Sequence, residues 1–99
     1  MSTYHLTVDV HYSHPTGIID DSRYRIYVDN EMLTERSWNW LTNVLIRENL
    51  VVQLEPGTHT VSLIESNSHI TQGRFNLKDL TIDGKLVDTP QGLSISFNI

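Results

Sequence analysis

The chain has 99 residues, and its formal net charge is −5 at pH 7. A chain of this length forms a single domain, 1–99, and buries only about two-thirds of the surface that its unfolded form exposes. The seven Lys and Arg residues form no basic run, so the sequence predicts no binding of nucleic acid, and the absence of cysteine excludes disulfides and thiolate metal sites.

The first residues, MSTYHLTVDV, lack the basic start and long apolar region of a secretory signal peptide. No apolar run approaches the roughly 20 residues that a membrane-spanning helix needs. We therefore expect a soluble protein that starts at its own Met1, has no signal peptide and does not bind a membrane.

Alternating apolar residues dominate the first part of the chain. From Tyr4 to Tyr12 every second side chain is apolar or aromatic, which is typical of a strand with one buried face. The same pattern returns at 23–28. The Asp-Asn-Glu sequence at 29–31 then predicts a turn, and a return strand is expected to start near Met32.

The two tryptophans are the most distinctive surface candidates in the sequence. If 34–40 stays extended, Arg36, Trp38 and Trp40 share one face, where the two indoles could stack sugar rings or anchor a protein partner. The alternative is that at least one indole packs in the core, as large aromatic residues usually do. Residues 41–45 are interpreted as a connection.

The segment 48–65, ENLVVQLEPGTHTVSLIE, contains two alternating apolar runs on either side of a Pro-Gly turn. It predicts either a β-hairpin or an arch from one sheet to another. As a hairpin it would place Glu48 opposite Glu65, and paired like charges destabilise a sheet. Such a pair needs a solvated rim, a bridging arginine such as Arg36 or Arg47, or a cation.

The C-terminal third predicts four further strands. A strand at 70–77 and a short one at 80–82 are expected first. Asp83-Gly84, a strong hairpin signal, follows them and leads into a strand at 85–87. After a turn at 89–92, four apolar residues alternate with polar ones and are expected to face inward: Leu93, Ile95, Phe97 and Ile99.

Short strands spaced about ten residues apart, with polar turns between them, predict an all-β fold. We expect an antiparallel β-sandwich of jelly-roll-like type, with both chain ends tied into sheets. No nucleophile elbow, phosphate-binding glycine loop or HExxH motif occurs, so we do not expect an enzyme.

A second group of carboxylates lies around neighbouring loops, at Asp20 and Asp21 with Asp29 and Glu31. Calcium needs several converging oxygen ligands, and the spacing of an EF-hand loop is absent. A solvated acidic loop is the favoured interpretation. The metal candidates are therefore Asp20, Asp21, Glu48 and Glu65, with calcium as the possible ion.

The runs RIYVDNEML, VVQLEPGTHTVSLIE and GRFNLKDLTIDGKLV give the chain a hairpin layout that is similar to calcium-dependent xylan-binding modules and related jelly-roll carbohydrate-binding modules. That resemblance covers about two-thirds of the chain. It implies a sandwich that binds carbohydrate with the help of calcium, through Trp38 and Trp40, with oxygen ligands from Asp20, Asp21 or Glu65.

The run DNEMLTERSWNW, followed by IRENLVVQLEPGTHTVSL, resembles small virion-associated proteins of tailed phages, especially those that infect cyanobacteria. This resemblance implies an accessory or decoration protein that acts through contacts rather than chemistry, located in the virion or the host cytoplasm. Our leading expectation is thus a non-catalytic assembly protein whose partners are protein subunits, as a homo-oligomer or a larger assembly. The alternative is a carbohydrate-binding module.

Overall fold

The computed structural model describes residues 1–14, 22–38, 44–66, 73–88 and 92–99. These residues form the strands β1 (Ser2–Ser13), β2 (Arg23–Val28), β3 (Glu31–Ser37), β4 (Leu45–Leu54), β5 (Thr58–Glu65), β6 (Arg74–Ile82), β7 (Lys85–Asp88) and β8 (Ser94–Asn98). Among the described residues, no helix is long and apolar enough to cross a membrane.

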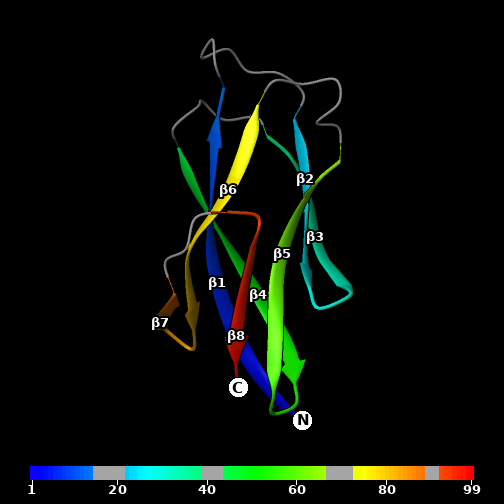
Figure 1. Ribbon diagram of the computed structural model, residues 1–99, viewed down its shortest axis with the longest axis vertical. Helices are drawn as coiled ribbons and strands as arrows, with labels where there is room; N and C mark the ends of the chain where they lie inside the picture. The colour runs from blue at the N-terminus through cyan, green and yellow to red at the C-terminus, as the bar shows by residue number, and fades with distance from the viewer. Residues whose placement is uncertain (15–21, 39–43, 67–72, 89–91) are drawn as a thin grey trace.

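The strands build two four-stranded antiparallel sheets, in the orders β4-β1-β6-β7 and β3-β2-β5-β8. The sheets pack into an elongated molecule of 43 × 22 × 17 Å (Figure 1). The expected all-β antiparallel sandwich is confirmed. Its jelly-roll connectivity stays a prediction.

The core follows the alternation read from the sequence. In β1, a central strand, Leu6, Val8, Val10 and Tyr12 are all fully buried. Inward positions of the other strands complete the core with Tyr24, Ile26, Val28, Leu50, Val52, Leu54, Val61, Leu63, Phe75, Leu77, Leu80, Ile95 and Phe97. Burial of this shared apolar surface is the main force that joins the two sheets.

The segment 48–65 is an arch and not a hairpin, because β4 and β5 belong to different sheets. Glu48 pairs with Val8 in one sheet, whereas Glu65 pairs with Tyr24 in the other. The hairpin interpretation, with its opposed carboxylates, is therefore wrong. Gly57 has a φ of 139°, a conformation that glycine adopts at little cost.

Both chain ends are tied into sheets beside this arch, as expected. At the N-terminus, Ser2 pairs with Leu54 at the end of β4. At the C-terminus, the Ile99 amide donates to the Gly57 carbonyl at 2.9 Å, and the Gly57 amide donates back to Ile99 at 3.2 Å. Figure 1 shows the N-terminus next to the turn between β4 and β5, with the C-terminus in the same half of the molecule.

The second half of the chain confirms one turn and corrects two details. Asp83 and Gly84 form the expected hairpin turn, with φ values of 49° and 84°. β6 runs unbroken through 74–82, because Asp79 takes a φ of 53° and absorbs a register shift against β1. Leu93 is 44% exposed, so the inward alternation starts only at Ile95.

Candidate functional site

Trp38 lies in the core rather than on a binding surface. Only 1% of its surface is exposed, and its ring centroid lies 5.4 Å from Tyr12 and 5.7 Å from Phe75. Such tilted and edge-on aromatic contacts stabilise a core beyond the area that they bury. Trp38 thus offers no face for stacking a sugar, and Trp40 lies outside the described residues.

Arg36 bridges the two sheets through Glu48. Its Nε donates to both carboxylate oxygens of Glu48, at 3.0 and 2.9 Å, and its Nη2 lies 2.8 Å from Oε1. The Tyr24 hydroxyl donates to Glu48 Oε2 at 3.1 Å. Because Arg36 and Tyr24 come from β3 and β2 and Glu48 from β4, this cluster ties one sheet to the other.

The surroundings of the cluster fix its charge states. Burial, and then the negative charge of Glu48, raise the pKa of the Tyr24 hydroxyl far above its usual range. The hydrogen bonds to Glu48 raise the pKa of the Arg36 guanidinium. Glu48 is only 3% exposed, so its carboxylate oxygens have these two partners in place of water. We interpret the cluster as a structural ion pair rather than as a cation site.

Glu65 has a separate role at the same end of the core. Its Oε1 accepts a hydrogen bond from the Phe75 amide at 3.0 Å, which links β5 to β6. Among the described residues, no group of three or more His, Asp or Glu side chains could hold a metal ion. The other metal candidates, Asp20 and Asp21, lie outside those residues.

Asp29 and His59 form a contact that the sequence did not predict, and we call this pair the latch. His59 Nδ1 lies 2.8 Å from Asp29 Oδ2, and His59 Nε2 lies 2.7 Å from the Glu55 carbonyl. Asp29 Oδ1 also accepts from the Thr60 amide at 3.0 Å. Only a protonated imidazole can donate to acceptors on both sides. The latch thus joins the β2–β3 turn to the arch.

These contacts shift both pKa values. The hydrogen bonds to Asp29 and to the Glu55 carbonyl raise the pKa of His59, and the hydrogen bond from His59 lowers the pKa of Asp29. The only sequence signal was the turn-forming Asp29, whose φ of 54° suits Asp and Asn. No local pattern placed His59 beside it.

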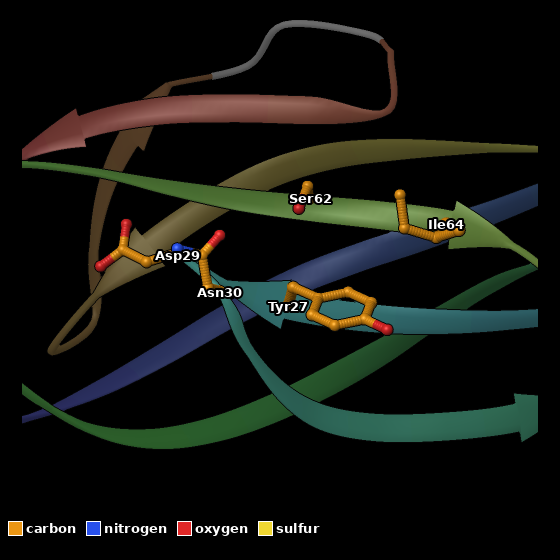
Figure 2. A pocket seen from close by; sticks show the side chains of 5 residues that line it. All are labelled: Tyr27, Asp29, Asn30, Ser62 and Ile64. Carbon is orange, nitrogen blue, oxygen red and sulfur yellow. The ribbon is translucent and has the colours of Figure 1, made fainter.

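A shallow hollow of about 290 Å³ lies on the outer face of the second sheet. Figure 2 shows Tyr27 from β2 beside Ser62 and Ile64 from β5, with Asp29 and Asn30 at one end. Its polar end and open shape make it a small surface depression. It contains none of the residues that the sequence analysis proposed for binding.

β4 forms one edge of the first sheet and carries an exposed apolar side chain. β4 pairs with β1 over ten consecutive positions, and among the described residues no strand pairs with its other side. Val51 is 70% exposed on this strand. Beside it lies a hollow of about 380 Å³, lined by Met1, Glu31, Leu33, Val51, Val52 and Gln53.

Comparisons of the chain with protein-family models, with curated proteins and with solved structures gave no match.

Proposed function

We propose that this chain is a non-catalytic binding and assembly protein that contacts other protein subunits through the exposed side of β4. The resemblance to virion-associated phage proteins supports a small structural or accessory protein of a phage, present in the virion or the host cytoplasm. One observation supports the proposal: β4 is a long, regular strand with an exposed valine, and no strand of the described residues pairs with its second side. Unpaired edge amides and carbonyls are templates for another strand.

Sedimentation velocity across about a hundredfold range of protein concentration tests this proposal, because mass action drives assembly. We expect the average mass to rise above that of one chain as the concentration increases. A mass equal to one chain at every concentration, together with no binding to co-expressed structural subunits of the same phage, would contradict the proposal.

The alternative proposal is a carbohydrate-binding module assisted by calcium, with Trp40 and Arg36 as contacts. It is favoured by the resemblance to xylan-binding modules and by the uncharged outer face of β5 and β8, where Thr58 donates to Asn98 at 2.8 Å. Tryptophan fluorescence should then shift on addition of xylan or cello-oligosaccharides with calcium. An unchanged spectrum across a glycan panel would exclude this alternative.

A further inference from the structure

The four strands at the sheet edges differ in how well they could accept another strand. β7 and β8 span only four and five residues, and the pairing of β3 with β2 contains a register shift. β4 spans ten residues without a shift, a proline or a lysine. Short strands, bulges, prolines and lysines are common protections against edge-to-edge pairing, and β4 has none of these four; its charged residues are Arg47 and the inward-pointing Glu48.

We infer that β4 pairs with β4 of a second copy of this chain, so that two four-stranded sheets join into one across a twofold axis. This inference rests on the proposed assembly function and names its partner. Antiparallel pairing about a twofold axis makes the contact self-complementary, which is the commonest form of dimer.

The sequence of β4 selects one register for this pairing. With Val51 on the axis, Val51 faces the partner's Val51 on the outer surface of the joined sheet. Two positions away, Asn49 faces the partner's Gln53, and both side chains are amides. Four positions away, Arg47 faces the partner's Glu55, the residue that directly follows β4, so continuing the pairing by one residue places two pairs of opposite charges beside the centre.

Neighbouring registers lose this complementarity. With Asn49 on the axis, Arg47 faces the partner's Val51. With Leu50 on the axis, Arg47 faces the partner's Gln53. With Val52 on the axis, Glu55 faces an asparagine and Val51 faces a glutamine. None of these places a cation opposite an anion. Pro56 ends the pairing in each case, because it has no amide hydrogen to donate.

Arg47 is placed to take part in such a pair. Its Nε donates to Asp9 Oδ1 at 3.1 Å, which orients the guanidinium over β1 and β4. The Arg47 side chain remains 64% exposed, and a guanidinium has further N–H groups to donate to the partner's Glu55. Asp9 and the partner's Glu55 would thus flank one cation.

The inner face and the hollow beside β4 also suit a second copy. In the Val51-centred register, Leu50 faces the partner's Val52, which extends the apolar inner surface across the joint. The hollow lined by Leu33, Val51 and Val52 lies along the same edge. A neighbouring strand there would cover apolar surface that is exposed in the single chain.

Disulfide trapping tests the register directly, because the chain contains no cysteine. Val51→Cys places two thiols at directly opposite positions, where Cα atoms lie about 4.5–5.5 Å apart, within the range of a disulfide. We expect it to cross-link to a dimer on mild oxidation. Asn49→Cys is the matched control on the same outer face, and its two thiols would be separated by more than about 13 Å along the strands. We expect it to remain uncross-linked.

A charge substitution tests the contact without cross-linking. Val51→Lys brings two cations together at the axis, so we expect the dissociation constant of the dimer to rise about tenfold or more. Leu86→Lys makes a similar change at β7, where Leu86 is 60% exposed, and it should leave the constant unchanged. Far-ultraviolet circular dichroism and thermal melts would verify that both variants fold.

The outcomes separate the inference from the proposed function. If Val51→Lys assembles like the wild type, or if Asn49→Cys cross-links and Val51→Cys does not, the inferred pairing is overturned while assembly through another surface stands. If the wild type shows only single chains at every concentration, the self-pairing is overturned, and the proposed function then depends on the co-expressed subunits. The inference is supported if Val51→Lys loses assembly while Leu86→Lys keeps it, and if Val51→Cys forms the disulfide-linked dimer while Asn49→Cys does not.

Discussion

Two polar clusters stabilise this sandwich, and they differ in the exposed fractions of their side chains. In one, Arg36 and Tyr24 contact the carboxylate of Glu48, which is only 3% exposed. In the other, His59 contacts Asp29, whose side chain is 45% exposed. Both have favourable hydrogen-bond distances. In the first cluster the anion is almost enclosed while Arg36 is 42% exposed, and in the second His59 is 14% exposed while the anion is open to water.

This difference determines what each cluster contributes to stability. A buried charge that loses its partner keeps the full cost of its desolvation, whereas exposed groups exchange a lost partner for water. The buried cluster should therefore respond strongly to substitution. The exposed latch should respond mainly to pH, because its contacts raise the pKa of His59 above the ordinary histidine value.

The largest expected effect comes from Arg36→Ala, which leaves Glu48 buried without its cation. We expect the free energy of unfolding to fall by about 2–3 kcal/mol, less than for a fully buried ion pair, because Arg36 is 42% exposed and its removal admits some water to Glu48. Urea unfolding followed by tryptophan fluorescence measures this change, since Trp38 lies in the core.

Arg25→Ala is the matched control for that variant. Arg25 pairs with Glu35, the neighbour of Arg36 on β3, but both side chains are nearly half exposed. We expect its unfolding midpoint to stay close to that of the wild type. Equal losses in the two arginine variants would contradict the distinction between the buried and the exposed pair.

A smaller effect is expected from Tyr24→Phe, which removes one hydrogen bond to Glu48 and leaves the ring in the core. The expected loss is about 1–2 kcal/mol, the cost of leaving part of a buried acceptor unsatisfied. Tyr27→Phe, on the half-buried outer face, is the control and should cost less. A neutral Tyr24→Phe would show that Arg36 alone satisfies Glu48.

The exposed latch should show itself in the pH dependence of stability. The raised pKa of His59 means that its contribution is fully present below the ordinary value of 6.5 and is lost as the pH rises through the raised value. The lowered pKa of Asp29 means that its contribution is present above 3.8 and is lost as the pH falls through the lowered value. Between these limits the latch contributes fully.

Thermal melts of the wild type and of His59→Gln across that pH range measure this contribution. We expect the difference between the two melting temperatures to shrink as the pH rises from about 6 to 9, because deprotonation removes the charge that the wild type uses. A difference that stays constant over this range would mean that the latch does not depend on the imidazolium.

Local patterns predicted most of the strands but not their sheets. Alternation from Tyr4 to Tyr12 and the Asp83-Gly84 turn are short-range signals, and the structure confirms both. The Pro-Gly turn after Glu55 suits a hairpin and an arch equally well. Which one forms depends on where β1 and β2 lie, since they pair with β4 and β5 in separate sheets.

The same limit applies to the candidate site. The sequence singled out Glu48 only as the partner of Glu65 in a hairpin that does not form, with Arg36 as one of the arginines that could bridge the two carboxylates. The hydrogen bond from Tyr24 to Glu48 joins residues 24 positions apart. The contacts of Asp29 with His59 and with the Thr60 amide join residues 30 and 31 positions apart. The first contact exists only once the two sheets have packed, and the contacts of Asp29 only once β2 has paired with β5, so no local pattern contains them.

β4 runs from the buried cluster to the arch, and the functional account depends on its second side, with which no strand in the described part of the chain pairs. Hydrogen–deuterium exchange at rising protein concentration tests that account most directly. We predict that exchange of the 45–55 backbone amides slows as the concentration rises, while exchange in β8 stays unchanged. Exchange rates in 45–55 that do not change with concentration, or protection that appears in β8 instead, would contradict it.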